Sequence, residues 1–246
     1  MEHEHRSVLT LFANRPFSAG ASVHLDDDAA HHARVRRVRP GDAIRLLDGA
    51  GAMASGVVAS ISRHSVEVRL DDVDRHPRPT TLEVIVPVAD RDRMLLAAEK
   101  CVELQITAWH PVYFSRSKSV ASRGEGEKFH DKVSARMRSA LEQSGGAWLP
   151  RIHEESDAEA ALQTIGASQR RFILDARGAS FHGQALADET AVAVGPEGGL
   201  ESAELERAIA LGWTPVSLGN TTLRFETAII AAVAVIRAAQ HSQGRV

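Results

Sequence analysis

The chain has 246 residues, which is enough for one large domain or two modest ones with a buried core. Its 29 lysines and arginines against 32 aspartates and glutamates give a net charge of -3, which excludes a global attraction to nucleic acid, so any RNA contact must be local. The single cysteine, Cys101, excludes an internal disulfide framework and a cysteine-based zinc site. We expect a cytoplasmic protein that is not in a membrane, because the first residues lack the apolar core of a signal peptide and no apolar run is long enough to span a bilayer.

Residues 1–76 carry short apolar segments separated by turn residues, and this pattern predicts a small β-barrel domain. One helix is expected over residues 28–38, because acidic residues precede it and arginines end it, which suits the two ends of a helix dipole. Its arginines either form an ordinary charged helix end or contact RNA phosphates, and the candidates for the second role are Arg34, Arg36 and Arg37. The pair His31-His32 has no further ligands at metal-binding spacing, so no metal is expected. The expected strands are residues 8–12, 43–47, 52–61 and 65–70.

Residues 71–81 have the composition of a linker, and we place the domain boundary within it, with a second domain over residues 77–246. Apolar strands alternate with helices there, which predicts an α/β domain with a parallel sheet. The last helix, residues 226–240, is apolar on every face over its first part, so it is expected in the core, in a subunit interface, or partly in both. The other expected helices are residues 91–106, 127–144 and 201–211, and the expected strands are residues 82–88, 109–114, 171–174, 191–194 and 216–218.

Two loops follow short apolar strands in the C-terminal third. One is Gly195-Pro196-Glu197-Gly198-Gly199, and the other begins at Leu218-Gly219 and ends at Arg224-Phe225-Glu226. Ligands bind at the carboxyl ends of strands in open α/β sheets, so we expect the two loops to share a ligand. Taken alone, the glycine loop is explained as well by a plain strand-to-helix turn as by a ligand site. It matches neither the dinucleotide-binding pattern nor the P-loop pattern.

The combination of these motifs resembles the RsmE family of SPOUT methyltransferases, which methylate N3 of one uridine in the decoding region of bacterial 16S rRNA with S-adenosylmethionine. The resemblance covers nearly the whole chain. It implies a trefoil-knotted parallel sheet with helices on both faces, a preceding PUA-like β-barrel that helps to hold RNA, and a homodimer. Sequence physics alone would nearly exclude a knot, so the knot rests wholly on the resemblance. The motifs are residues 194–199, Leu218-Gly219, Leu223-Arg224 and Glu226-Thr227-Ala228, with upstream similarity at residues 99–104, Arg116-Ser117, residues 142–144 with Pro150, and residues 31–49.

The resemblance also implies where the cofactor and the reacting groups lie. Uridine N3 must lose its proton before it attacks a methyl group, so a base and a stabiliser of negative charge are required. Arg224 is the candidate stabiliser for the uracil oxygens, and Glu226 or Glu197 is the candidate proton acceptor. A structural role explains Glu226 equally well, in which its carboxylate accepts backbone amides at the N-terminus of a helix. The residues expected to hold the cofactor are Leu174, Val194, Gly195, Pro196, Glu197, Gly198, Gly199, Leu218, Gly219, Asn220 and Leu223.

A basic run in the second domain is the candidate for phosphate contacts, through Arg116, Lys118 and Arg123, although a solvated helix face is the plainer explanation. The partner would be 16S rRNA or the small ribosomal subunit. Three positions depart from the family pattern: Phe225 replaces a small hydroxyl residue, Gln105 replaces a glycine, and an arginine common near Gly146 is missing. These departures leave two alternatives open, a SPOUT enzyme for another RNA nucleotide and an RNA-binding or ribosome-assembly protein that has lost catalysis.

Overall fold

The computed structural model describes residues 8–117, 123–167, 169–181 and 188–243. It divides into two compact units, residues 1–78 with 141–149, and residues 79–140 with 150–246. The sequence predicts that residues 141–149 belong to the second domain. In the structure they join the first unit, through contacts with residues distant in sequence. Trp148 forms an isolated bridge with Ala50, and the Glu142 carboxylate accepts the Phe12 amide at 2.8 Å.

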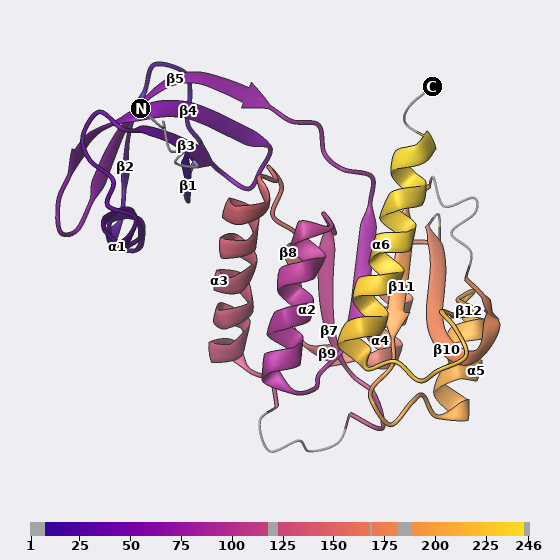
Figure 1. Cartoon of the computed structure of the whole chain (residues 1–246). Coiled ribbons are helices and arrows are strands. Elements are labelled where there is room, and N and C mark those ends of the chain that lie inside the picture. Colours follow the sequence, from indigo (N-terminus) through magenta and orange to yellow (C-terminus); the bar gives the residue numbers. More distant parts are fainter. Residues whose placement is uncertain (1–7, 118–122, 168, 182–187, 244–246) are drawn as a thin grey trace. The chain divides into compact units, whose positions relative to one another are not determined.

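The first unit is a curled five-stranded sheet in the order β1-β3-β4-β5-β2, with one helix (Figure 1). The pairing is antiparallel except between β1 and β3. The predicted β1, β3 and β4 are confirmed, β5 runs longer than expected, and β2 was not predicted. The helix starts one residue earlier and ends sooner, at Val35, and Arg37 beyond it has a left-handed φ of 56°. The elements are β1 (Leu9–Phe12), β2 (Ser22–Leu25), α1 (Asp27–Val35), β3 (Ala43–Leu47), β4 (Ala52–Ile61) and β5 (Val66–Arg75).

The second unit is an α/β fold around a sheet in the order β12-β10-β11-β6-β7-β8, in which β9 also pairs with β7. Every pairing in this sheet is parallel, as predicted. The short β8, β9 and α4 were not predicted. The strands are β6 (Leu82–Pro87), β7 (Ala108–Tyr113), β8 (Arg151–Ile152), β9 (Ser156–Asp157), β10 (Arg170–Ser180), β11 (Thr190–Val194) and β12 (Thr214–Ser217), and the helices are α2 (Arg91–Glu103), α3 (Glu127–Ser144), α4 (Ala158–Thr164), α5 (Ser202–Ala210) and α6 (Phe225–Gln243).

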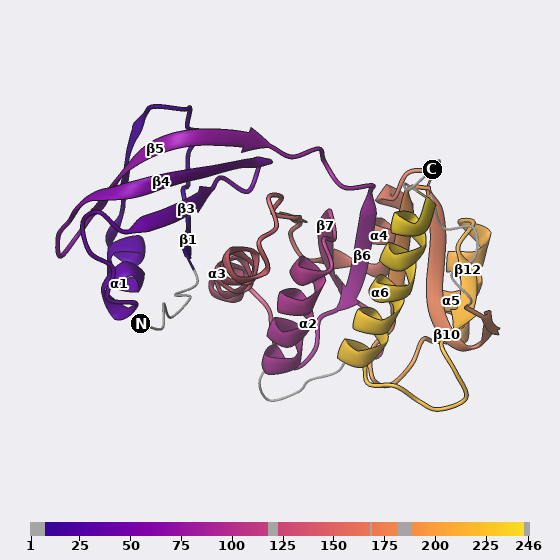
Figure 2. The same cartoon turned by 45° about the horizontal axis from the view of Figure 1, so that its top comes forward.

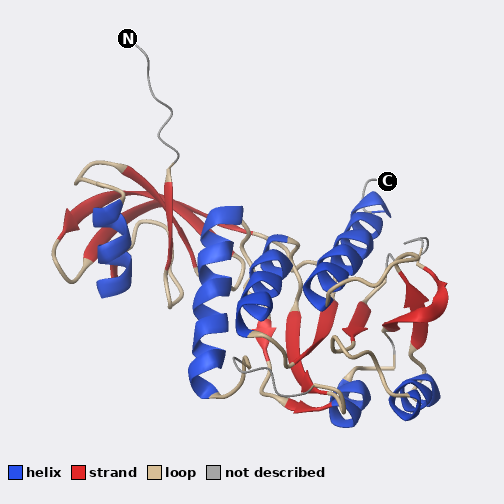
Figure 3. Cartoon of the chain, turned by 60° about the horizontal axis from the view of Figure 1, so that its bottom comes forward, coloured by secondary structure: helices blue, strands red, loops and turns tan. Residues whose placement is uncertain are grey.

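Helices cover both faces of this sheet, which confirms the predicted fold class (Figures 2 and 3). Helix α6 packs on α2, β6 and β11 on one face. Helices α4 and α5 pack together on the other, where α4 contacts β7 and β9 and α5 contacts β12. The central strand β11 is buried along its whole length, which explains its continuous apolar sequence. Because β11 and β12 both pair in parallel with β10, which lies between them, the loops that follow β11 and β12 meet at one edge of the sheet.

Helix α6 is buried on one side of this chain rather than all round. Ile229, Val233 and Ile236 are fully buried, whereas other apolar residues of the helix are only half-buried. Its far end is held by the buried Arg237, whose guanidinium donates to the backbone carbonyls of Leu104 and Thr80 at 3.2 and 2.8 Å, to the Gln105 carbonyl, and to the side chain of Gln240 at 2.6 Å. One side chain therefore ties α6 to the end of α2 and to the chain that enters β6. The half-buried apolar residues are Ile230, Ala231, Ala234 and Val235.

Gln105, one of the departures from the family pattern, stands at the position that ends α2. It has a left-handed φ of 58°, and the Ile106 amide reaches back to the Cys101 carbonyl, as at a glycine-terminated helix. A side chain in this conformation costs about 1–2 kcal/mol, whereas glycine adopts it without that cost.

We expect Gln105→Gly to raise the free energy of unfolding by about 0.5–1 kcal/mol, because the relieved strain exceeds the extra entropy that glycine has in the unfolded chain. Urea unfolding followed by circular dichroism measures the change. Gln105→Ala is the matched control, since it keeps a Cβ and hence the strain, and it should show no gain. A glycine variant less stable than the parent chain would contradict this explanation.

Candidate functional site

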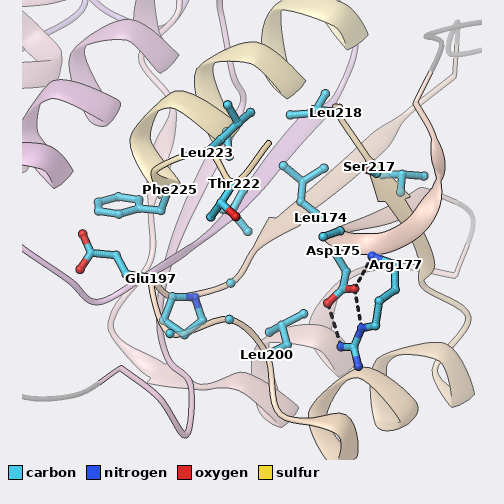
Figure 4. A pocket seen from close by; sticks show the side chains of 18 of the residues that line it. Leu174, Asp175, Arg177, Glu197, Leu200, Ser217, Leu218, Thr222, Leu223 and Phe225 are labelled. Atoms are coloured by element: carbon cyan, nitrogen blue, oxygen red, sulfur yellow. Dashed lines mark hydrogen bonds and ion pairs between the residues drawn. The ribbon is translucent and has the colours of Figure 1, made fainter. Parts of the chain in front are cut away.

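The loops after β11 and β12, together with residues 174–177 of β10 and the start of α6, line a pocket of about 540 Å³ at the carboxyl edge of the second unit's sheet (Figure 4). This volume is typical of a small-molecule site. The two loops that the sequence predicts to share a ligand therefore lie on one cavity. The lining residues are Arg116, Leu174, Asp175, Ala176, Arg177, residues 194–200, Ser202, residues 216–219, residues 221–223, Phe225 and Ala228.

The glycine loop needs its glycines for two different reasons. A Cβ on Gly195 would lie 2.9 Å from the Leu200 side chain, so a larger residue does not fit there. Gly199 has a left-handed φ of 72°, which disfavours any other residue. Arg116 packs beside Gly198 and donates to its carbonyl at 2.9 Å. The backbone of this loop therefore forms one wall of the pocket, and the Arg116 side chain holds it in place.

The pocket has apolar walls and a charged corner. In Figure 4, Leu218 and Leu223 lie above Leu174, and Asp175 with Arg177 lies at the lower right, next to Leu174. Arg177 donates to both oxygens of the Asp175 carboxylate, at 2.8 and 2.9 Å, and the pKa of Asp175 is lowered by that hydrogen-bonded guanidinium. The corner therefore carries an ionised carboxylate. No motif in the sequence pointed to this pair.

All the residues predicted to hold the cofactor line this pocket except Asn220, which lies outside the lining. Their neighbours Thr221 and Thr222 line it as well. The departure at Phe225 is also part of the wall, since this side chain is 2% exposed at the first position of α6. Phe225 thus packs behind the loop and contributes to the wall of the pocket.

The predicted reacting residues take three different positions. Glu197 lines the pocket, and Glu226 is buried behind it in the first turn of α6, with an exposed fraction of 7%. Arg224 is exposed and does not line the pocket, and its backbone carbonyl accepts the Ala228 amide at 2.9 Å to start α6. The structure therefore brings the two carboxylates together but leaves the Arg224 side chain outside the pocket.

Arg93, which the sequence reading missed, joins the two carboxylates. Its Nη1 pairs with Glu197 Oε1, and its Nε lies 3.9 Å from Glu226 Oε1. Glu226 Oε2 is buried and has no hydrogen-bond partner within the described chain. A helix N-terminal role predicts backbone amides on this oxygen, so the unpartnered Oε2 favours a functional carboxylate. One feature of the sequence could have pointed to Arg93: it is a cation in the first turn of a helix, where the helix dipole disfavours positive charge.

The residues predicted to contact RNA are spread over the two units. Arg34, Arg36 and Arg37 are exposed at the end of α1. Arg116 lies 3.7 Å from Glu201 in addition to its contact with Gly198, and Arg123 lies 3.2 Å from Glu125, so both cations already have acidic neighbours. Lys118 lies outside the described residues.

The described residues contain no cluster of three or more histidine, cysteine, aspartate or glutamate side chains placed to hold a metal ion. None of the helices described is long and apolar enough to cross a membrane.

Comparison with known proteins gives consistent matches along the chain. Residues 76–237 match the model of an RNA methyltransferase domain, and residues 25–71 match an RNA methyltransferase PUA domain. The ribosomal RNA small subunit methyltransferase E of Synechocystis is 28% identical over 89% of this chain and 73% of its own, and that of Mycobacterium tuberculosis is 29% identical over 90% and 87%. The crystal structure of the Neisseria gonorrhoeae enzyme of the same name, bound to S-adenosyl methionine, has a TM-score of 0.86 at 28% identity and covers 94% of this chain and 97% of that chain.

Proposed function

This chain belongs to the RNA methyltransferase family, and from that premise we propose that it methylates N3 of one uridine in the decoding region of 16S rRNA with S-adenosylmethionine. The family model covers most of the second unit, and the PUA model covers much of the first. The relatives are named for methylation of small-subunit ribosomal RNA. The choice of uridine N3 rests on the RsmE resemblance of the motifs.

One observation carries the cofactor assignment: residues 174–177 of β10, the glycine loop and the loop at residues 218–223 line a single pocket. The apolar leucine walls suit the ring of an adenosine, and the backbone of the two loops offers amides and carbonyls for its polar edges. The pocket volume of about 540 Å³ suits a ligand of this size. Bound there, S-adenosylmethionine supplies a methyl group activated by a sulfonium charge.

The chemistry of uridine assigns roles to the charged residues. Glu226 would accept the N3 proton, and the freed lone pair of N3 would form the new bond to the methyl carbon while the bond between that carbon and the sulfonium sulfur breaks, so that a neutral thioether leaves. Glu197 lines the pocket and is the alternative acceptor. Arg224, with its exposed side chain, stabilises the negative charge that spreads to the uracil oxygens once the RNA is bound.

The remaining parts of the proposal concern partners. The exposed arginines of α1 and the basic residues Arg116, Lys118 and Arg123 would contact 16S rRNA or the small ribosomal subunit. The half-buried apolar residues of α6 support a homodimer, since a second chain would cover them. The C-terminal knot remains part of the proposal, and a ribosomal substrate agrees with a cytoplasmic location.

Leu223→Asp tests the pocket. We expect it to raise the Kd for S-adenosylmethionine at least tenfold in calorimetric titration, because burial of a leucine contributes about 1.5–3 kcal/mol. Leu223 is itself 36% exposed, so the fold should tolerate the change. Ile209→Asp on α5 is the control, because Ile209 is 48% exposed and lies outside the pocket lining. Unchanged binding in Leu223→Asp would exclude this pocket as the cofactor site.

The parent chain in the same titration separates the alternatives. Absence of S-adenosylmethionine binding would contradict both enzyme proposals and favour an RNA-binding or assembly protein. Mapping of modified nucleotides in rRNA from cells that lack the protein then tests the target. An unchanged decoding-region uridine would exclude it and favour a SPOUT enzyme for another nucleotide.

A further inference from the structure

Arg93 contacts both candidate proton acceptors at once. Its guanidinium pairs with Glu197 through Nη1 and approaches Glu226 to 3.9 Å through Nε. The three residues come from three separate parts of the second unit: the first turn of α2, the loop between β11 and α5, and the first turn of α6. One side chain therefore links the glycine loop to the start of the helix that follows the second loop.

Arg93 contacts Glu226 at one carboxylate oxygen and leaves the other free. The Glu226 side chain is 9% exposed, and its Oε2 has no hydrogen-bond partner among the described residues. Its Oε1 faces the Arg93 guanidinium, whose Nε lies 3.9 Å away. A planar guanidinium holds a neighbouring carboxylate in a defined geometry. Arg93 is therefore placed to orient Glu226 without occupying the free oxygen.

Local helix preferences do not explain an arginine at this position. The first turn of a helix carries a partial positive charge, which disfavours a cation. The Asp90 side chain caps α2 by accepting the backbone amides of Asp92 and Arg93 at 3.1 and 3.2 Å, so the amide of Arg93 serves the helix cap while its guanidinium pairs with Glu197. The contacts of the side chain therefore account for Arg93 better than its helix does.

We propose that Arg93 is a positioning residue for methyl transfer, which orients Glu226 and fixes the glycine loop through Glu197. Arg93 acts through these carboxylates and does not touch the reacting atoms. The inference rests on the proposed function, because it assumes that Glu226 accepts the proton. It adds that the competence of this base depends on a residue of α2, far from either loop in sequence.

The experiment compares Arg93→Met, Arg93→Lys and the parent chain by single-turnover methyl transfer to 16S rRNA in small ribosomal subunits, at neutral pH and saturating S-adenosylmethionine, and by the midpoint of urea unfolding. We expect Arg93→Met to lower the rate by about tenfold or more, because both carboxylates lose the side chain that positions them. The unfolding midpoint should stay close to that of the parent chain, because partly exposed ion pairs contribute little to stability. Arg93→Lys should recover most of the rate, because it retains the charge. Lys100→Met, also on α2 and also paired with two carboxylates, is the matched control and should leave both quantities unchanged.

The unfolding midpoint and the lysine variant distinguish positioning from a structural role. A rate within about twofold of the parent chain in Arg93→Met would overturn the proposal. So would equal losses of rate in Arg93→Lys and Arg93→Met. If Arg93→Met fails to fold, as judged by circular dichroism, Arg93→Lys decides, because a fall in its unfolding midpoint together with its rate contradicts the proposal. A parent chain that transfers no methyl group would instead contradict the proposed function.

Discussion

Glu226→Gln is expected to lower the single-turnover rate of methyl transfer by about 10²–10⁴-fold, the usual contribution of a general base. Glutamine keeps the size of the side chain but cannot accept the proton of N3. Because Glu226 lies behind the pocket and does not line it, the Kd for S-adenosylmethionine should remain within about twofold of the parent value. Rapid-quench kinetics and calorimetry measure the two quantities separately.

Glu206→Gln on α5 is the matched control, since its carboxylate is exposed and lies outside the pocket lining, and it should transfer methyl groups at the parent rate. Glu197→Gln tests the alternative base. If Glu197→Gln suffers the large loss while Glu226→Gln stays within a few fold of the parent chain, the acceptor is the pocket-lining carboxylate and the buried one is structural.

Element type in this chain was predictable wherever a strong local pattern was present. The apolar β11 and the striped α3 follow directly from their sequences, and α3 has the predicted bounds. The short elements β8, β9 and α4 were missed because a few residues carry too little periodicity to read. Residues 141–149 complete the first unit through contacts with residues more than 90 positions away, and no local pattern reports such contacts.

The site was predictable in its backbone and less so in its charges. Glycines mark a loop that must approach a ligand closely, so the pocket lining followed from the motifs. The pairing of Arg93 with Glu197 and Glu226 depends on which strand ends and helix starts become neighbours, which only the tertiary fold decides. The same dependence on the tertiary fold applies to Arg224. Its motif predicts a residue of the active site, but its side chain is exposed in this chain.

The largest effect on stability is expected at Arg237, because its guanidinium is buried and satisfies backbone carbonyls that have few other donors. Burial lowers its pKa to about 10, so it remains charged at neutral pH, and no carboxylate of the described chain lies within ion-pair distance. Arg237→Leu removes the donors for the carbonyls of Leu104, Thr80 and Gln105. Each carbonyl left buried without a donor costs about 1–3 kcal/mol, partly offset because no charge is buried any longer.

We therefore expect Arg237→Leu to lower the free energy of unfolding by about 3–5 kcal/mol, measured by urea denaturation. The exposed pair of Arg207 with Glu159 gives the matched control, since Arg207→Leu should cost less than about 1 kcal/mol. Arg237→Lys should lie between the two, because one ammonium group cannot reach all the carbonyls that the planar guanidinium serves. Since α6 also carries Glu226 in its first turn, a loosened far end should reduce methyl transfer only at temperatures where the helix begins to unfold. A loss below 1 kcal/mol in Arg237→Leu would mean that water or a rearranged chain end satisfies these carbonyls, and that α6 is held by its apolar face alone.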